Sequence, residues 1–411
     1  MKAIGQKCRS CGAPLHTTFV DLGATPLANS LLLPEDMEKA ETYLPLRAYV
    51  CDRCFLVQLQ DFVRPENIFH DYLYFSSFSS TWLAHARDYV QMITRRLGLD
   101  ENSFVVEVAS NDGYLLKEFV ASGIPCLGIE PAENVADVAR AANVPTKSVF
   151  FGKKTAGEIV DQYGRADLII ANNVLAHVPD LNDFIGGFKA LLSENGVLTL
   201  EAPHFLKLLQ DVQFDTIYHE HYSYLSLLSV EHAVAQHGLE VFDIEEVPTH
   251  GGSLRYYIRQ EEKAAVSDRL LAVRAQEMRA GLNDLQTYSG FQQRVLEIKY
   301  QLLQFLLEAR RQGRSVAAYG AAAKGNTLLN YCGIDRDLIS FAVDRNPHKQ
   351  GRYLPGSRIP VFGPDEVTLR RPDYLLILPW NLKSEIMASM AEIREWGARF
   401  VWAVPRLEVS A

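Results

Sequence analysis

The sequence predicts an α/β protein in which a small cysteine-bearing module precedes two doubly wound sheets. The N-terminal region holds two C-x-x-C pairs, and the order strand, turn, helix and strand ending in an acid occurs twice further along the chain. The length of 411 residues agrees with this organisation, since domains of ~100 to 200 residues would make two or three.

The composition is that of a compactly folded protein and excludes several classes. Hydrophobic residues make up 48% and charged residues 22%, which excludes a disordered, collagen-like or low-complexity chain. The net charge of −9 disfavours binding of nucleic acid or an anionic membrane through the general surface. No run approaches the ~20 apolar residues that span a bilayer, and residues 1–8 lack the apolar core of a signal peptide. We therefore expect a cytoplasmic protein without nucleic-acid or membrane partners.

A cysteine quartet at the N-terminus predicts one zinc ion. The motifs are Cys8-Arg9-Ser10-Cys11 and Cys51-Asp52-Arg53-Cys54, whereas the other two cysteines, Cys126 and Cys332, stand alone. Because the four thiolates of Cys8, Cys11, Cys51 and Cys54 leave no coordination position for a water, the zinc is expected to be structural. A redox role for either pair is the weaker alternative, since neither pair opens a helix after a buried strand.

The residues between and after the two pairs predict loops and one strand. Residues 24–30 predict a loop, and Tyr43–Val50 predicts a strand that enters the second pair. Residues 69–77 are rich in aromatic and hydroxyl side chains. That composition suits core and turn residues, and it suits equally a segment that caps a cleft.

The middle of the chain predicts the first doubly wound sheet. Phe104–Ala109 is a short apolar strand, residues 110–113 form a turn into a helix over 114–121, and Pro125–Ile129 is a second strand that ends at Glu130. Further strands are expected at 166–171 and 196–201, with helices between them.

The turn after the first strand indicates the ligand of this sheet. It has one glycine where a dinucleotide fingerprint has three, so NAD is a poor fit. Residues 107–113 instead resemble a variant of the first motif of S-adenosylmethionine-dependent methyltransferases, with Ala109 at the first glycine position. An acid at the end of the second strand suits both ribose hydroxyls. The candidate cofactor-binding residues are Glu107, Ala109, Asn111, Asp112, Gly113, Glu130, Asn172 and Asn173.

A cluster of acid, base and phenol groups over residues 214–224 is the candidate catalytic segment. It follows a strand that ends near His204, and active sites of open sheets lie at such carboxyl ends. An extended segment would point His219 and His221 to one side, whereas a helical turn places Tyr218 beside His221, and we favour the turn. The alternatives are a polar loop with satisfied side chains and a second metal site at His219 and His221, for which no third ligand is evident.

The C-terminal third predicts connecting helices and then a second Rossmann-like domain. Ser267–Gln312 is mostly helical, and strands are expected at 316–319, 339–344, 374–381 and 400–404. A glycine turn from Gly320 leads into a helix, and Asp344 ends the next strand. The helix start suits a phosphate, to which Lys324 could add charge. A close-packed corner with an exposed lysine is the plainer alternative, and NAD is a further rival.

The whole chain resembles the sugar C-3-methyltransferases, which make branched deoxysugars for antibiotics and bacterial glycans. The resemblance rests on the cysteine module, the Asn111-Asp112-Gly113 turn, the Asn-Asn-Val-x-x-His run at 172–177, and the stretches 218–221, 250–255 and 320–325, all in the family's order. It implies that His221 is the base and that His177, Tyr218 and Glu220 surround the sugar. His219 is given no role. The implied substrate-binding residues are Gly320, Ala321, Lys324, Gly325 and Asn326.

The resemblance and the chemistry together predict a reaction and three sequence domains. Methylation of carbon needs a carbanion or enolate, a 4-keto sugar has an acidic C–H at C-3, and a neutral histidine suits its removal. Tyr218 and His177 could donate to the developing oxyanion, and Glu220 is expected to orient a histidine. The predicted domains are a zinc-binding module (1–75), an S-adenosylmethionine-binding methyltransferase domain (76–265), and a helical connection with a sugar-nucleotide-binding Rossmann-like domain (266–411).

Two rival functions share parts of this pattern. A zinc-containing RNA methyltransferase would have the cysteine module and the cofactor domain, but the chain lacks a Lys/Arg-rich stripe with interleaved aromatics. A non-catalytic nucleotide-binding protein would leave residues 218–221 without a task. The preferred substrate is a nucleotide-linked sugar, with dTDP as the nucleotide.

Overall fold

The chain forms two compact units, each assembled from separate stretches of sequence. The computed structural model describes residues 6–63, 76–78, 80–261 and 265–410. Unit 1 comprises residues 1–15, 51–204 and 222–283, and unit 2 comprises residues 16–50, 205–221 and 284–411. The chain therefore passes between the units after Leu15, Val50, His204, His221 and Asn283.

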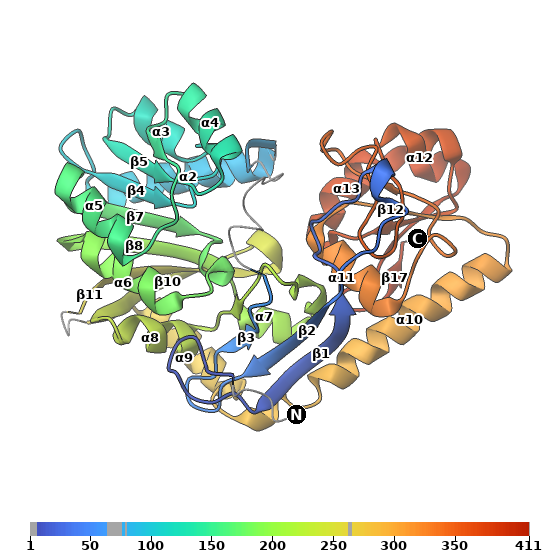
Figure 1. Cartoon of the computed structure of the whole chain (residues 1–411), viewed down its shortest axis with the longest axis horizontal. Coiled ribbons are helices and arrows are strands. Elements are labelled where there is room, and N and C mark those ends of the chain that lie inside the picture. The colour runs from blue at the N-terminus through green and yellow to red at the C-terminus, as the bar shows by residue number, and fades with distance from the viewer. Residues whose placement is uncertain (1–5, 64–75, 79, 262–264, 411) are drawn as a thin grey trace. The chain divides into compact units, whose positions relative to one another are not determined.

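Unit 1 is a seven-stranded sheet covered by helices on both faces (Figure 1). The strand order is β10-β11-β8-β7-β4-β5-β6, and the strands from β8 to β6 run parallel while β11 and β10 are antiparallel additions. The seven strands of this sheet are β4 (Val105–Val108), β5 (Cys126–Ile129), β6 (Thr146–Lys147), β7 (Ala166–Asn172), β8 (Leu192–Pro203), β10 (Leu239–Val247) and β11 (Ser253–Gln260). Unit 1 also contains β3 (Val57–Leu59) and β9 (Ser223–Tyr224), which pair antiparallel with each other. The helices are η2 (Ser76–Phe78), α2 (Ser80–Leu97), α3 (Leu116–Ala121), α4 (Glu133–Ala141), α5 (Lys153–Tyr163), η3 (Leu175–His177), α6 (Leu181–Leu191), α8 (Leu227–Ala235), η5 (Thr249–Gly251) and α9 (Asp268–Arg279).

Short apolar runs explain the central strands of this sheet. All four residues of β4 are buried, because the side chains of Val105 pack into one core with α2 and α3 while Val106 and Val108 pack into a second core with α5 and α6. Such runs are typical of parallel strands that are covered on both faces. The register pairs Asn172 at the end of β7 with Glu201 of β8, so both lie near one carboxyl edge.

Unit 2 contains a six-stranded sheet in the order β14-β13-β12-β15-β16-β17, parallel except for β17, together with an antiparallel pair of β1 and β2. Its strands are β1 (Thr17–Thr25), β2 (Leu44–Val50), β12 (Val316–Tyr319), β13 (Ala342–Val343), β14 (Val361–Phe362), β15 (Tyr374–Ile377), β16 (Arg399–Trp402) and β17 (Glu408–Val409). The helices are η1 (Pro34–Asp36), α7 (Phe205–Gln210), η4 (Phe214–Thr216), η6 (Leu285–Tyr288), α10 (Phe291–Arg311), α11 (Ala323–Cys332), α12 (Asp365–Arg370), η7 (Trp380–Leu382), α13 (Lys383–Ser389) and η8 (Ala391–Trp396).

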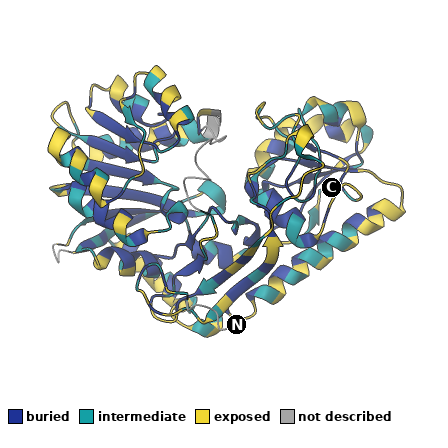
Figure 2. Cartoon of the chain, viewed as in Figure 1, coloured by how far each residue is buried: buried dark blue, intermediate teal, exposed yellow. Residues whose placement is uncertain are grey.

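The long helix α10 shows how an apolar stripe positions the parts of unit 2. Its buried residues recur every three or four positions, which is the period of one helix face. At its start Phe291 stacks on Phe19 of β1, with ring centroids 4.4 Å apart. The central strands of both sheets are buried, whereas the outer faces of the helices are exposed (Figure 2).

These observations confirm the predicted α/β class with a cysteine module and Rossmann-like sheets. Most of residues 69–77, for which a capping role was one alternative, lies outside the described residues. The expected loop at 24–30 begins two residues late, at Pro26, because β1 continues to Thr25. In the described part of the chain, no helix combines the length and apolar character that a membrane span needs.

Candidate functional site

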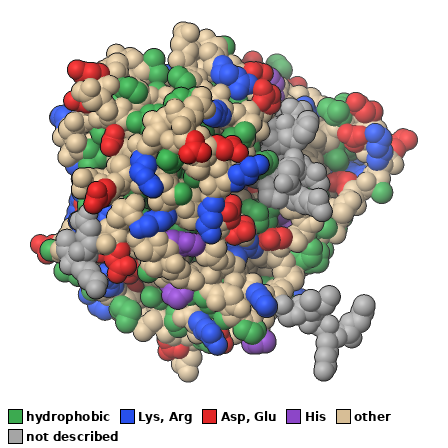
Figure 3. Space-filling model, turned by 60° about the vertical axis from the view of Figure 1, so that its left-hand side comes forward, with side chains coloured by type: hydrophobic (Ala, Val, Ile, Leu, Met, Phe, Trp, Pro, Cys, Tyr) green, Lys and Arg blue, Asp and Glu red, His purple; other side chains and the backbone are tan. Residues whose placement is uncertain are grey.

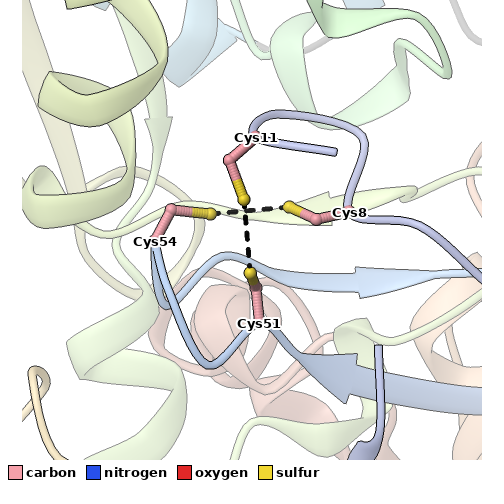
Figure 4. A group of neighbouring side chains, drawn as sticks. All are labelled: Cys8, Cys11, Cys51 and Cys54. Carbon is pink, nitrogen blue, oxygen red and sulfur yellow. Dashed lines mark hydrogen bonds between the residues drawn. The ribbon is translucent and has the colours of Figure 1, made fainter. Parts of the chain in front are cut away.

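The four predicted metal ligands converge in unit 1. The sulfur atoms of Cys8, Cys11, Cys51 and Cys54 all lie within 4.8 Å of one another and point toward a common centre (Figure 4). The Sγ atoms of Cys8 and Cys54 are 3.5 Å apart, and those of Cys11 and Cys51 are also 3.5 Å apart. A zinc ion with Zn–S bonds of ~2.3 Å would place its sulfur ligands about 3.8 Å apart, so the quartet has the size of a tetrahedral zinc site.

The chemistry of this quartet also fits a cation. The neighbouring sulfurs of Cys51 and Cys8, together with burial, raise the pKa of the Cys54 thiol. Four clustered cysteines, three of them buried, would ligate as thiolates only with a positive ion between them to neutralise their charge. The side-chain amide nitrogen Nε2 of Gln58 donates to the Cys8 sulfur at 3.2 Å and supports this ligand from outside the quartet.

The turn between β4 and α3 has the backbone of a ligand-binding turn. Ala109, Asn111 and Gly113 have φ angles of 59°, 50° and 76°. An alanine in this left-handed region is strained by about 1–2 kcal/mol, which explains why glycine is usual at the first position of such a motif. Backbone strain of this kind concentrates at functional sites.

Glu130 lies at the end of β5, as predicted, and holds this turn. One carboxylate oxygen accepts a hydrogen bond from the backbone N–H of Asn111 at 3.0 Å, and the other accepts from that of Ala132 at 2.9 Å. The side chain is buried, and burial raises its pKa. Each carboxylate oxygen has a second lone pair, so these two bonds leave acceptor capacity for a ligand.

The residues at this carboxyl edge fit a cationic polar cofactor. Burial, followed by the negative charges of Asp112 and Glu130, raises the pKa of Glu107 well above its ordinary value. S-adenosylmethionine carries a sulfonium and an ammonium group, which would favour the ionised carboxyls. Within the described residues, the buried Oδ1 atoms of Asn172 and Asn173 have no hydrogen-bond partner, and acceptors of this kind suit an ammonium group.

Two serines that the sequence analysis did not single out contact this turn. The backbone N–H of Ser76 donates to Asn111 Oδ1 at 2.9 Å, and the Ser77 hydroxyl donates to Asp112 Oδ2 at 2.5 Å. The only sequence signal was the hydroxyl-rich end of the 69–77 segment. Asn111 and Asp112 therefore fix a neighbouring segment as well as the turn.

A buried ion network at the end of β8 was also missed. Glu201 accepts hydrogen bonds from Arg255 Nη2 at 2.8 Å and from the Thr249 hydroxyl at 2.9 Å, and its carboxylate lies 2.9 Å from His85 Nε2. Burial acts to raise the pKa of Glu201, but the His85 hydrogen bond and the Arg255 charge lower it to about 2. Arg255 belongs to the 250–255 stretch of the family resemblance, which was the available signal.

The candidate catalytic segment in unit 2 forms the turn that we favoured. The N–H of His221 donates to the carbonyl oxygen of Tyr218 at 2.8 Å, and the Tyr218 hydroxyl lies 2.7 Å from His221 Nε2. His221 Nδ1 lies 2.9 Å from the carbonyl oxygen of Thr216. Because a carbonyl can only accept, Nδ1 carries the proton, and the Nε2 of a neutral His221 is the basic nitrogen that accepts from Tyr218.

Glu220 has a partner that differs from the expected one. Its two carboxylate oxygens accept from the Asn29 side-chain amide at 2.8 and 2.9 Å, so this carboxylate is bonded to an amide where a histidine was expected. Burial raises the pKa of Glu220 to about 7, although the Asn29 bonds and the charge of Lys349 act to lower it. Asn29 was read only as a loop residue, and no pattern in the sequence marked it.

The two remaining histidines of the prediction have different surroundings. His219 is buried, and its Nε2 donates to the carbonyl oxygen of Pro45 at 3.2 Å, which gives it a structural contact. Because Nε2 of His219 makes this hydrogen bond and both ring nitrogens of His221 also make hydrogen bonds, a metal site at His219 and His221 is disfavoured. His177 lies in unit 1 at the end of η3, directly after the β7 edge that carries Asn172 and Asn173.

The predicted substrate-binding residues gather at the start of α11. A Cβ at Gly320 would lie 2.5 Å from Pro379, and one at Gly325 would lie 2.8 Å from Leu378, so both glycines are required for close packing. The N–H of Ala321 donates to Asp344 Oδ2 at 2.7 Å. Helix α11 begins without a side-chain cap, which leaves backbone donors of its first turn for a ligand.

Two polar side chains near the start of α11, those of Asn326 and Lys324, make hydrogen bonds to different partners. Asn326 Nδ2 donates to the carbonyl oxygen of Ala28 at 2.6 Å, while its buried Oδ1 has no partner within the described residues. Lys324 Nζ donates to Asn381 Oδ1 at 2.7 Å and lies 4.8 Å from the centre of the Trp380 ring. Burial lowers the pKa of Lys324, against the effect of nearby Asp215.

Three family models match successive parts of the chain. A zinc binding domain matches residues 8–69, a methyltransferase domain matches residues 82–244, and a C-methyltransferase C-terminal domain matches residues 248–405.

Known proteins match the chain over different lengths. The C-methyltransferase NovU of Streptomyces niveus is 36% identical over 408 residues, which cover 98% of this chain and 96% of NovU. A ubiquinone biosynthesis O-methyltransferase of Rhodopseudomonas palustris is 23% identical over 96 residues, covering 23% of this chain and 38% of that protein. A solved S-adenosylmethionine-dependent methyltransferase of Clostridium acetobutylicum matches with a TM-score of 0.35 and 12% identity, over 43% of this chain and 91% of its own.

Proposed function

The chain belongs to the S-adenosylmethionine-dependent C-methyltransferases, and we propose that it methylates C-3 of a nucleotide-linked 4-keto-deoxysugar. The proposed nucleotide is dTDP, and the proposed role is the biosynthesis of branched deoxysugars. The enzyme uses S-adenosylmethionine and one structural zinc. The sugar, the nucleotide and a cytoplasmic location are parts of the proposal that come from the sequence.

The chemistry of carbon methylation sets what the protein must supply. When bound, S-adenosylmethionine supplies an electrophilic methyl group. The acceptor carbon must become nucleophilic, and the C-3 hydrogen beside a 4-keto group is acidic enough for a protein base to remove it. The enzyme therefore needs a positioned base and a donor for the enolate oxygen.

The fixed tautomer of His221 is the observation that carries the proposal. The Thr216 carbonyl holds the proton on Nδ1 and leaves Nε2 as the acceptor. In this form the imidazole can take a proton without first losing one. The resulting imidazolium keeps its bond to Thr216, because Nδ1–H donates in both states.

Tyr218 and the other predicted residues receive supporting roles. The Tyr218 hydroxyl donates to Nε2 before substrate arrives, and we assign it afterwards to the enolate oxygen. His177 is proposed as a second donor. Glu220, with its raised pKa, holds the loop of Asn29 beside the 218–221 turn and presents a polar group to the sugar hydroxyls.

The start of α11 is the proposed site of the nucleotide diphosphate. Backbone N–H groups of the first helical turn suit phosphate oxygens, and Lys349 lies at the same turn, with Nζ donating to the Ala321 carbonyl oxygen at 2.9 Å. The predicted residues Gly320, Ala321, Lys324, Gly325 and Asn326 belong to this site. Lys324 contributes positive charge there although its Nζ is bonded to Asn381.

The surface charge favours a small molecule over RNA as the substrate that accepts the methyl group. On the face shown in Figure 3, positive and negative side chains are interspersed and form no broad basic stripe. The net charge of −9 points the same way.

Substrate assays with a His221→Asn variant test the proposal. The variant should lower kcat by ~10² to 10⁴, the usual contribution of a positioned base, while the affinity for S-adenosylhomocysteine stays unchanged. Wild-type enzyme should also exchange the C-3 hydrogen of a dTDP-linked 4-keto sugar with solvent deuterium when S-adenosylhomocysteine fills the cofactor site. His232→Asn, which changes an exposed histidine of α8, is the matched control.

Two outcomes would contradict this proposal in different ways. Equal exchange rates in wild type and His221→Asn would assign the base to another residue. Methylation of RNA with no methylation of the keto-sugar would replace the substrate class.

A further inference from the structure

Arg9, one of the two residues between the predicted zinc ligands Cys8 and Cys11, has a largely buried side chain that donates to several acceptors. Its side chain is 9% exposed, which is unusual for arginine. Nη1 donates to the carbonyl oxygen of Pro179 at 2.6 Å, and Nη2 donates to the carbonyl oxygen of Leu59 at 2.5 Å and to Asp61 Oδ1 at 2.7 Å. Three acceptors around one guanidinium need its planar fork, which a lysine does not have.

The Pro179 contact ties the first C-x-x-C pair, Cys8–Cys11, to the segment that carries His177. This pair is called the zinc knuckle below. Pro179 lies two residues after His177, and the chain continues from there into α6. Asn182 of α6 returns the contact, since its Nδ2 donates to the carbonyl oxygens of Arg9 and Ser10, both at 3.0 Å. The segment 179–182, which directly follows His177 and Val178, is thus bonded to residues 9 and 10 at both of its ends.

A second set of contacts ties the knuckle to the residue that follows His221. The Arg9 guanidinium carbon lies 5.3 Å from the centre of the Tyr222 ring, and Tyr222 is 1% exposed. The N–H of Leu59, whose carbonyl accepts from Arg9, donates to the carbonyl oxygen of Tyr222 at 2.9 Å. The backbone of Arg9 is itself fixed, because its N–H donates to Gln58 Oε1 at 2.9 Å.

We infer that Arg9 is a positioning residue that uses the rigid zinc knuckle to hold the segments bearing His177 and Tyr222. This inference rests on the proposed function for the importance of His177 and of His221, the neighbour of Tyr222. The zinc quartet then does more than stabilise the N-terminal module, since it fixes the backbone from which Arg9 extends. Its role is indirect, because Arg9 acts through the segments it binds.

The test compares Arg9→Gln and Arg9→Lys with Arg53→Gln. Arg53 is the arginine of the second C-x-x-C pair and is exposed, so it controls for loss of a positive charge beside the zinc. Each protein is measured for zinc content, for amide hydrogen exchange over 174–182 and 222–224, and for kcat and KM with the dTDP-linked keto-sugar. The exchange measurement needs no substrate, so it stands even if the proposed function fails.

The expected result is specific to Arg9. Arg9→Gln should keep one zinc per chain, exchange faster in both segments, and lower kcat by ~10 to 100-fold with little change in KM, as is usual for residues that orient a site. Arg9→Lys should restore part of the rate, and Arg53→Gln should match wild type. Unchanged exchange in both segments would overturn the inference, and so would loss of zinc in Arg9→Gln, which would make Arg9 part of the metal site. If Arg9→Gln does not fold, Arg9→Lys decides by the same two measurements.

Discussion

Glu220 makes the stability of the protein depend on pH in a predictable direction. Burial raises its pKa from an ordinary value near 4.5 to about 7, so the folded state holds the proton more tightly than the unfolded state between these two values. The free energy of unfolding should therefore contain a contribution that is complete below pH 4.5 and is lost as the pH rises through 7. A shift of this size corresponds to up to about 3 kcal/mol.

Denaturation of Glu220→Gln at several pH values measures this contribution. Because glutamine does not titrate, the variant should not lose stability as the pH rises. Its free energy of unfolding should therefore increase relative to wild type by up to about 3 kcal/mol between pH 4.5 and pH 8. Glu395→Gln changes an exposed glutamate of η8 and should follow wild type. Parallel curves for wild type and Glu220→Gln would show that the carboxyl is not perturbed.

Glu130 should contribute to cofactor affinity in two ways. It is the predicted partner of the ribose, and it also holds the N–H groups of Asn111 and Ala132. Glu130→Ala should therefore weaken S-adenosylmethionine binding by ~1–3 kcal/mol, the cost of unmatched buried polar groups. Calorimetry measures this loss, with the exposed Glu133→Ala as the control, and an unchanged affinity for Glu130→Ala would remove Glu130 from the cofactor site.

Some site residues were predictable and others were not, for physical reasons. Tyr218 and His221 are three residues apart, so a single turn brings them together and local spacing suffices to predict the pair. Asn29 and Glu220 are 191 positions apart, and only the folded chain joins them. Lone asparagines in loops are common, so nothing distinguished Asn29 beforehand.

At the scale of elements, the zinc knuckles carry the clearest prediction. Cys51→Ser should lower zinc content and the midpoint of thermal unfolding together, because metal binding and folding are coupled at such sites. Metal analysis and calorimetry on the same samples test this. Cys126→Ser, which changes a cysteine of β5, should keep its zinc, and full zinc retention in Cys51→Ser would refute the quartet.

The strands that were predicted differ in kind from those that were not. β4, β5, β7 and β12 are short apolar runs before a turn and a helix, so sequence pattern alone indicates them. β10 and β11 mix charged and apolar residues without a regular period and pair antiparallel with each other, as in Glu245 opposite Arg255. Their place beside β8 depends on pairing between distant segments, which a local pattern does not contain.

At the scale of the whole molecule, the segments of each unit depend on one another. Unit 2 takes in β1 and β2 as well as residues 205–221. Within it, Phe19 stacks on Phe291, and Phe214 packs edge-on against Tyr331 with ring centroids 5.5 Å apart. The domain boundary that the sequence predicts at 265/266 remains a prediction.

A fragment of residues 266–411 provides the test of that boundary. Expressed alone it would lack β1, β2 and η4, so Phe291 and Tyr331 would lose their packing partners Phe19 and Phe214 and become exposed. We expect it to unfold without a cooperative transition, as followed by circular dichroism during chemical denaturation. The full chain is the control. A cooperative transition in the fragment would establish 266–411 as an independent domain.

The interleaving of units was beyond the sequence analysis. Motif order along the chain correctly gave a cysteine module followed by two Rossmann-like sheets. It did not indicate that the 39 residues between Cys11 and Cys51 supply a β-hairpin to the unit that contains the C-terminal sheet. That assignment depends on which apolar surface the hairpin packs against. The spacing of motifs along the chain does not indicate which distant segments pack together.

The two cysteine pairs flank β1 and β2 in the sequence, and this arrangement has a consequence for biosynthesis. All four cysteines leave the ribosome before α10 is translated, so a metal ion could close the loop over 12–50 before Phe291 of α10 is present to cover Phe19. The nascent chain would then carry a metal-closed β1–β2 pair with an uncovered apolar face until α10 emerges. Slow translation of the long middle segment would prolong that exposure, so the yield of native enzyme should depend on chaperones that shield the hairpin during synthesis.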